Sequence, residues 1–206
     1  MARTAGRAAR SGPETRQSIL DVSQRLFAEK GYLGASLSDI VSDVGIAKPS
    51  LFHHFPNKER LYAAVLEKIA GTLEPIVSTC RDHTDPVEGL ILTARSLDQW
   101  CENNPEATCI VMRDMLDIGN RAAPPKSWPL AFFVESLADA HDKLPASTSL
   151  AALPFPAFLS LFLGSLNYAH VSRGTLTAMG KADQQGLTSA SGNLVEFLKD
   201  LLQPHS

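Results

Sequence analysis

Two short helix-forming stretches follow one another near the N-terminus, separated by a single glycine. Ser36 suits the N-cap of the first stretch, because its hydroxyl can accept from the free N–H groups of the first turn, and Gly45 ends that stretch. Pro49 suits the first turn of the second stretch, and Pro56 forbids its continuation. Glycine permits the positive φ angle that a tight turn between crossed helices requires. The spacing therefore predicts a helix-turn-helix over residues 36–55.

The rest of the chain also carries the signals of helices rather than strands. No run of residues alternates between apolar and polar between hairpin turns, whereas capping residues, prolines and apolar side chains three or four positions apart recur throughout. The sequence therefore predicts an all-α protein. The expected helices cover residues 13–30, 36–45, 48–54, 57–75, 86–102, 106–118, 127–143, 156–172 and 187–202.

Charge is distributed unevenly along the 206 residues. The whole chain carries a net charge of −3, with 19 Lys and Arg against 22 Asp and Glu. Residues 1–60 carry nine Lys and Arg against six acids, whereas residues 61–206 carry ten against sixteen. This asymmetry predicts that the N-terminal part faces a polyanion and that the remainder has another role. We expect a flexible basic arm over residues 1–12, a helix-turn-helix domain over 13–60 and a second domain over 61–206.

The cysteines and the apolar stretches bear on the cellular compartment. Cys80, Cys101 and Cys109 show no repeating spacing, which argues against a disulfide scaffold and favours a reducing cytoplasm. Buried apolar thiols are the expectation, and redox or metal sensing is the alternative. The basic start of the chain is followed by no apolar segment, so we expect no signal peptide. The longest apolar stretch, Leu153–Val171, contains polar residues and prolines, so we expect no membrane span.

No motif in the sequence predicts an enzyme, a cofactor site or a metal site. A Gly-rich phosphate loop, a GxSxG elbow and an HExxH pair are all absent. His53 and His54 are adjacent, and adjacent helical side chains point about 100° apart, so the two rarely share an ion. We expect His54 to be packed and hydrogen-bonded and His53 to contact a groove or a phosphate. Asp114 and Asp117 lie one turn apart, but nothing around them indicates acid–base chemistry.

The string from Ser36 to Tyr62, SLSDIVSDVGIAKPSLFHHFPNKERLY, closely resembles the N-terminal domain of the TetR family of transcriptional regulators. The matching features are a first helix ending in FAEKGY, the DIV and VGI segments around the turn, the LFHHF recognition helix and the NKERL that begins the fourth helix. The resemblance covers about residues 14–66. It implies a homodimer with two DNA-binding domains. It also implies an all-helical C-terminal domain that binds a small effector and supplies the dimer interface.

The resemblance also implies which residues contact the double-stranded operator. Lys48 can reach guanine O6 and N7, and Pro49 offers an apolar surface to a thymine methyl group. The Ser36 hydroxyl and the N–H groups that follow it can hold a phosphate, and Lys58 can bind another at the start of the fourth helix. The implied contacts are Ser36, Ser38, Lys48, Pro49, Ser50, Phe52, His53 and Lys58.

Three residues depart from the family's pattern. Phe52 stands where a tyrosine is common, so its ring surface alone can contact DNA and a phosphate bond is lost. Ala47 stands where a serine or threonine often caps the recognition helix, and the missing cap should cost about 1 kcal/mol. Val41 stands where alanine is usual, and its added bulk would change the angle between the two helices.

Apolar residues near the C-terminus predict a dimer interface through the last two helices. The helix over 156–172 is apolar on more than one face, so one face should pack within its own domain and another on a partner subunit. The small residues Gly164 and Ser165 would permit a helix of the partner subunit to approach closely. The final helix would complete a four-helix bundle across a twofold axis. An ordinary core within one domain is the alternative for these residues, which are Phe155, Phe158, Leu159, Phe162, Leu163, Leu166, Leu187, Leu194, Val195, Leu198, Leu201 and Leu202.

Large aromatic and methionine side chains of the second domain predict a pocket for a mostly apolar or aromatic effector. Such side chains suit a roomy apolar cavity, although they suit an ordinary core equally well. The candidates for the effector pocket are Trp100, Met112, Met115, Trp128, Phe132, Phe133 and Phe162.

Together these features predict a cytoplasmic, sequence-specific repressor that a small effector releases from its operator. One alternative is a DNA-binding dimer without an effector, whose C-terminal domain only dimerises or contacts another protein. A second is a helical enzyme with a chance helix-turn-helix. Turnover of a substrate would favour the enzyme, and a ligand that stabilises the protein without changing its DNA affinity would favour a binding module without regulation. The basic arm is either a solvated tail or a DNA contact.

Overall fold

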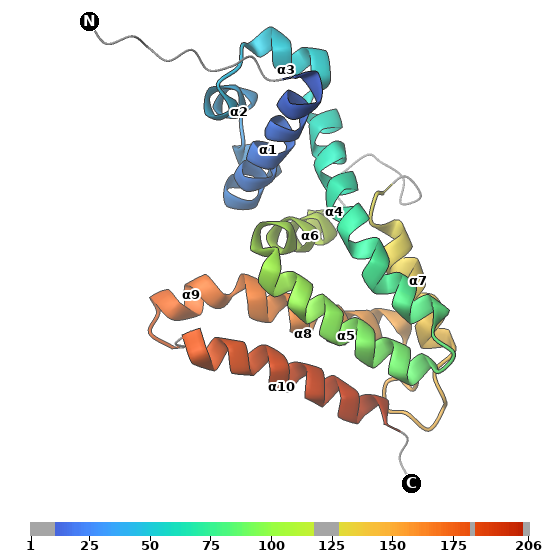
Figure 1. Ribbon diagram of the computed structural model, residues 1–206. Helices are drawn as coiled ribbons and strands as arrows, with labels where there is room; N and C mark the ends of the chain where they lie inside the picture. The colour runs from blue at the N-terminus through green and yellow to red at the C-terminus, as the bar shows by residue number, and fades with distance from the viewer. Residues whose placement is uncertain (1–10, 118–127, 182–183, 204–206) are drawn as a thin grey trace, which may run out of the picture. The chain divides into compact units, whose positions relative to one another are not determined.

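A computed structural model describes residues 11–117, 128–181 and 184–203. All ten regular elements within these residues are helices, which confirms the predicted all-α class (Figure 1). They are α1 (Gly12–Gly34), α2 (Leu37–Val44), α3 (Lys48–His54), α4 (Lys58–Asp82), α5 (Pro86–Asn103), α6 (Pro105–Asp117), α7 (Ala131–Asp142), α8 (Phe155–Val171), α9 (Arg173–Ala178) and α10 (Gln184–Leu202).

The chain divides into two compact units, Met1–Val65 and Leu66–Ser206, called here the N-terminal unit and the C-terminal unit. The division falls within α4, so this helix contributes residues to both. No helix in the described part of the chain has the length and apolar character needed to cross a membrane. Residues 1–10 of the expected basic arm lie outside the described residues.

Local signals set the bounds of α1. The Ser11 hydroxyl accepts from the Glu14 N–H at 3.4 Å, and the Glu14 carboxylate accepts from the Ser11 N–H at 2.8 Å. This reciprocal pair is a capping box. Gly31 interrupts the helix with φ 71° and ψ 172°, near the expected end, and one further turn continues to Gly34. Only glycine adopts such a backbone conformation without strain.

The core of the N-terminal unit gathers one apolar stripe from each helix. Two ion pairs also join α1 to α2: Arg25 Nη2 lies 2.6 Å from Asp43 Oδ2, and Lys30 Nζ lies 2.8 Å from Asp39 Oδ2. Apolar burial supplies most of the stability, because half-exposed ion pairs contribute little. The buried side chains include Ile19, Leu20, Leu26, Phe27, Ile40, Val44, Leu51, Phe55, Leu61, Tyr62 and Val65.

The expectation that the fourth helix ends at Pro75 is wrong, because α4 continues through Pro75 to Asp82. A proline inside a helix removes one backbone hydrogen bond and costs about 3 kcal/mol. Beyond the proline, the side chains of Val77 and Cys80 are both buried and extend the stripe formed by Leu73. Burying an aliphatic side chain contributes about 1.5–3 kcal/mol, so tertiary packing offsets the proline.

Other helix bounds follow the expected ones within a few residues, with two differences. The helix expected over 127–143 begins at Ala131, and residues 118–127 lie outside the description. The segment between the last two long helices contains the additional short helix α9. Asp85 caps α5 and accepts from the Val87 N–H at 2.9 Å, so α5 begins at Pro86, as expected.

In the C-terminal unit, α8 is the central helix and contacts α5, α6, α7, α9 and α10. Figure 1 shows α5 and α10 side by side with α8 behind them. Phe158 and Phe162 are buried on α8, with ring centroids 5.4 Å apart. Val195, Leu198 and Leu202 bury the inner face of α10, whereas the side chain of Leu187 lies outside the described part.

Candidate nucleic-acid interface

The turn between α2 and α3 is built on Gly45. The backbone of Gly45 is left-handed, with φ 74° and ψ 42°. Its N–H donates to Ser42 O at 3.2 Å and to Val41 O at 3.0 Å, and the Ile46 N–H donates to Val41 O at 3.2 Å. These bonds form a Schellman motif, which satisfies the last carbonyl groups of α2. The predicted helix-turn-helix is therefore present over residues 36–55.

Helix α3 buries one side chain and presents several others outward. Leu51 is fully buried, whereas Lys48, Pro49 and His53 are exposed and Phe52 has 40% of its surface exposed. Ala47 makes no side-chain capping bond, as its sequence implies. The departure from the family's pattern at Phe52 therefore leaves an apolar ring on the outer face of the helix.

The remaining predicted DNA contacts lie at the starts of helices. Ser36 and Ser38 are exposed, and the Ser36 hydroxyl accepts from the Asp39 N–H at 3.0 Å, so it caps α2 as expected. Ser50 is half-buried. Lys58, at the start of α4, is half-buried and donates from Nζ to Leu33 O at 3.4 Å. The structure shows where these side chains lie, whereas their contacts with DNA stay predictions.

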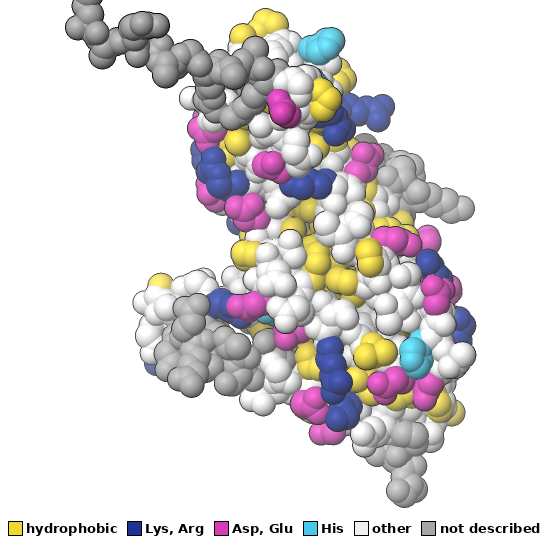
Figure 2. Space-filling view, in the orientation of Figure 1, with side chains coloured by type: hydrophobic (Ala, Val, Ile, Leu, Met, Phe, Trp, Pro, Cys, Tyr) yellow, Lys and Arg dark blue, Asp and Glu magenta, His cyan; other side chains and the backbone are white. Residues whose placement is uncertain are grey.

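Ion pairing separates the cations of residues 11–65 into two groups. Arg25 and Lys30 are paired with carboxylates, and Lys30 lowers the pKa of Asp39. By contrast, neither Lys48 nor Arg60 forms an ion pair within the described residues. On the face drawn in Figure 2, many Lys and Arg side chains lie beside Asp and Glu. The count of Lys and Arg side chains therefore overstates the number of cations available to a polyanion.

Two further cations of this unit, Arg16 and Arg60, are not among the residues that the sequence predicted to contact DNA. Arg60 is exposed in the first turn of α4, two positions after Lys58. The guanidinium of Arg16 lies 5.1 Å from the ring centroid of Phe55, which directly follows α3. The position of Arg60 next to Lys58 was readable from the sequence, whereas the contact of Arg16 joins residues far apart in the chain.

The comparisons agree with this geometry. The family described as "Bacterial regulatory proteins, tetR family" matches residues 19–65. The HTH-type transcriptional regulator LmrA of Bacillus subtilis (strain 168) is 34% identical over 79 residues, which are 37% of this chain and 42% of LmrA. The similarity thus spans less than half the length of this curated relative.

Solved structures extend the likeness to nearly the whole chain. A TetR-family transcriptional regulator from Pectobacterium atrosepticum has 26% identity and a TM-score of 0.55, covering 94% of this chain and 97% of that one. The chain belongs to the TetR family. The fatty acid degradation regulator FadR from Bacillus halodurans has 20% identity and a TM-score of 0.61, covering 96% of this chain and 100% of that one, which supports the fold.

In this TetR-family protein the predicted pocket residues lie on several helices of the C-terminal unit, except Trp128, which precedes α7. Trp100, Phe133 and Phe162 are buried, and the Trp100 Nε1 donates to Thr72 Oγ1 at 3.1 Å. The other four, which are Met112, Met115, Trp128 and Phe132, are half-buried. Trp128 Nε1 donates to Asp114, whose side chain is fully buried. Contact with an effector stays a prediction for all seven.

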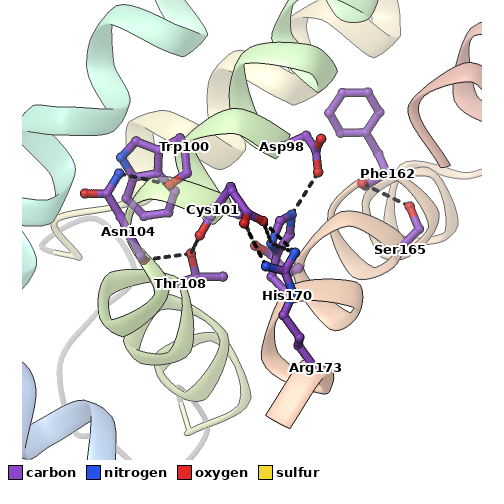
Figure 3. A network of polar contacts seen from close by, with 11 residues as sticks. Asp98, Trp100, Cys101, Asn104, Thr108, Phe162, Ser165, His170 and Arg173 are labelled. Carbon is purple, nitrogen blue, oxygen red and sulfur yellow. Dashed lines mark hydrogen bonds and ion pairs between the residues drawn. The ribbon is translucent and has the colours of Figure 1, made fainter. Parts of the chain in front are cut away.

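A polar network that the sequence did not suggest joins α5 to α8 and α9 of the TetR-family protein (Figure 3). His170 Nε2 lies 2.8 Å from Asp98 Oδ1. The guanidinium of Arg173 donates to both oxygens of Glu102, at 2.8 and 2.5 Å, and it lowers the pKa of that carboxyl. This network therefore links α8 and α9 to α5 through side-chain contacts.

The cysteines of the TetR-family protein follow the expectation of packed thiols at two positions. Cys80 and Cys101 are buried, and Cys109 is half-buried. The Cys101 thiol donates to Asn167 Oδ1 at 3.4 Å, and burial raises the pKa of Cys101 to about 12. A thiol with so high a pKa is a poor nucleophile at neutral pH. Among the described residues, no group of three or more His, Cys, Asp or Glu side chains is placed to hold a metal ion.

Proposed function

We propose that this protein is a cytoplasmic, sequence-specific DNA-binding repressor that a small, mostly apolar effector releases from its operator. The observation that carries the proposal is the outer face of α3. Lys48, Pro49 and Phe52 point outward on a helix that Leu51 anchors in the core. In a helix-turn-helix, the N-terminal residues of the second helix contact base edges in the major groove.

Each exposed residue has a chemically specific partner in that groove. Lys48 donates to guanine O6 and N7, and the ring of Phe52 and the pyrrolidine of Pro49 contact thymine methyl groups or sugars. Ser36, Ser38 and Lys58 bind phosphates, which position the domain without reading sequence. Ser50 and His53 complete the contacts. Arg60 is added to the phosphate contacts because its guanidinium forms no ion pair within the described part.

The dimer forms through α8 and α10. Two large apolar side chains support this surface: Tyr168 on α8 is 64% exposed and Phe197 on α10 is 50% exposed. A methyl group added at Gly164, one turn before Tyr168, would meet nothing within 4 Å, so the backbone of α8 is open to close approach. A second copy of the same surface would bury these side chains.

Effector binding is coupled to DNA binding through α4. This helix contains the predicted phosphate contact Lys58 in the N-terminal unit and the buried Ile69 and Leu73 in the C-terminal unit. Operator half-sites are spaced by multiples of about 34–36 Å, so a tilt of α4 would change the match to DNA. An effector that binds the tilted state a hundredfold more tightly than the other state supplies roughly 2.7 kcal/mol of coupling between effector binding and DNA binding.

The test begins with a duplex that the wild-type protein selects from a random-sequence pool. The selected site should be a palindrome bound by two chains, and its affinity should fall steeply with salt. Lys48→Ala should weaken binding by about 1–3 kcal/mol and relax the preference at one base pair. Arg95→Ala, an exposed cation of α5, is the matched control and should change neither quantity. Unchanged base preference in Lys48→Ala would refute the assigned role of Lys48, and failure to select any duplex would refute the function.

A further inference from the structure

The Lys58 side chain is held by two groups at the end of α1. Its ammonium lies 4.6 Å from the ring centroid of Tyr32 and donates to Leu33 O at 3.4 Å. An ammonium within about 6 Å of an aromatic ring is attracted by the negative face of the ring. Partial burial lowers the pKa of Lys58.

Tyr32 is itself fixed by other aromatic rings. Its ring lies 5.0 Å from that of Tyr62 on α4 and 6.2 Å from that of Phe27 on α1, and these two rings contact each other at 4.9 Å. The positive φ of Gly31 breaks α1 just before Tyr32. The result is an aromatic cluster of Phe27, Tyr32 and Tyr62, and the Lys58 ammonium contacts the Tyr32 ring of this cluster.

We propose that Tyr32 is a positioning residue for DNA binding, which holds the Lys58 ammonium in the place where it meets a backbone phosphate. This rests on the proposed function, in which Lys58 binds a phosphate. A free lysine side chain loses much rotamer freedom when it binds, whereas a side chain already held loses less, so the held form binds more tightly.

The held ammonium keeps donors for a phosphate. An ammonium has three N–H donors, and the Leu33 carbonyl occupies one of them. Ser36, the N-cap of α2, follows Leu33 by three residues, so the Cα atoms of the two lie within about 11 Å of each other. Lys58 is therefore held near the segment that joins α1 to α2, and this segment contains Ser36, a second predicted phosphate contact.

A double-mutant cycle with the duplex selected by the wild-type protein tests the proposal. Tyr32→Leu keeps an apolar side chain but removes the ring, and it should weaken binding roughly threefold. Tyr32→Phe keeps the ring and should bind nearly as the wild type does. Lys58→Ala should flatten the salt dependence by about one ion, and in that background Tyr32→Leu should have no further effect. Arg60→Ala is the matched background, in which the effect of Tyr32→Leu should persist.

Several results would overturn the proposal. Equal losses in Tyr32→Leu with and without Lys58 would show that Tyr32 does not act through Lys58. If Tyr32→Leu does not fold, proton chemical shifts of the Lys58 side chain in the wild type decide, because the ring of Tyr32 must shift them upfield and unshifted protons contradict the contact. A selected duplex that Lys58→Ala binds as tightly as the wild type refutes the phosphate contact of Lys58 and this inference, but leaves the proposed DNA-binding function standing. Selection of no duplex refutes the proposed function and this inference with it.

Discussion

Replacement of Gly45 by alanine perturbs the turn on which the helix-turn-helix depends. Gly45 has φ 74° and ψ 42°, a conformation in which the Cβ of an L-residue approaches the following carbonyl oxygen and costs about 1–2 kcal/mol. Loss of glycine's extra freedom in the unfolded chain offsets about 0.4–1 kcal/mol of that cost. We therefore expect Gly45→Ala to destabilise the N-terminal unit by about 1 kcal/mol.

The assay must report on the N-terminal unit, because both tryptophans, Trp100 and Trp128, belong to the other one. Hydrogen exchange followed by mass spectrometry on the full chain measures the protection of α1 to α3 directly. Gly12→Ala is the matched control, since Gly12 begins α1 and an added Cβ would meet nothing within 4 Å. That variant should be as stable as the wild type or slightly more stable.

Asparagine offers a graded third variant at the same position. Among non-glycine residues, asparagine adopts the left-handed conformation most readily, so Gly45→Asn should lose less protection than Gly45→Ala. If Gly45→Ala and Gly12→Ala changed protection of α2 and α3 equally, the positive φ of Gly45 would have no energetic role. That result would refute a stabilising role for glycine in the left-handed turn at position 45.

Two further predictions concern the C-terminal unit. Pro75→Ala should raise its stability to urea by about 1–3 kcal/mol, because the exposed proline interrupts the hydrogen bonding of a helix whose packing is already complete; a lower urea midpoint would contradict this. Arg173→Ala should lower stability at neutral pH by roughly 1 kcal/mol or less, since Glu102 is partly exposed. The Arg173 guanidinium lowers the pKa of Glu102, so this contribution is present above the unfolded pKa and is lost as pH falls through the folded one. The two urea midpoints should therefore converge below about pH 4, and a gap that widened there would contradict the assignment.

The sequence alone determined the helix-turn-helix and its bounds. Ser36, Gly45 and Pro49 act through atoms only a few residues away, so their capping, left-handed turn and first-turn roles could be predicted without tertiary structure. The same locality explains why the start of α5 at Pro86, directly after its N-cap Asp85, was predictable. These signals also carried the resemblance to the TetR family, because the family's motif lies within this short stretch.

Only the tertiary structure decided features that depend on partners distant in sequence. Pro75 is a local stop signal, yet α4 passes through it because Val77 and Cys80 find buried positions. Lys58 rests on Tyr32, 26 positions earlier, and no local pattern shows which cation an aromatic ring will hold. Caps and turns depend on backbone groups within one helical turn, so the sequence alone determined them. Apolar burial and long-range ion pairs depend on how the helices pack against one another, so only the tertiary structure decided them.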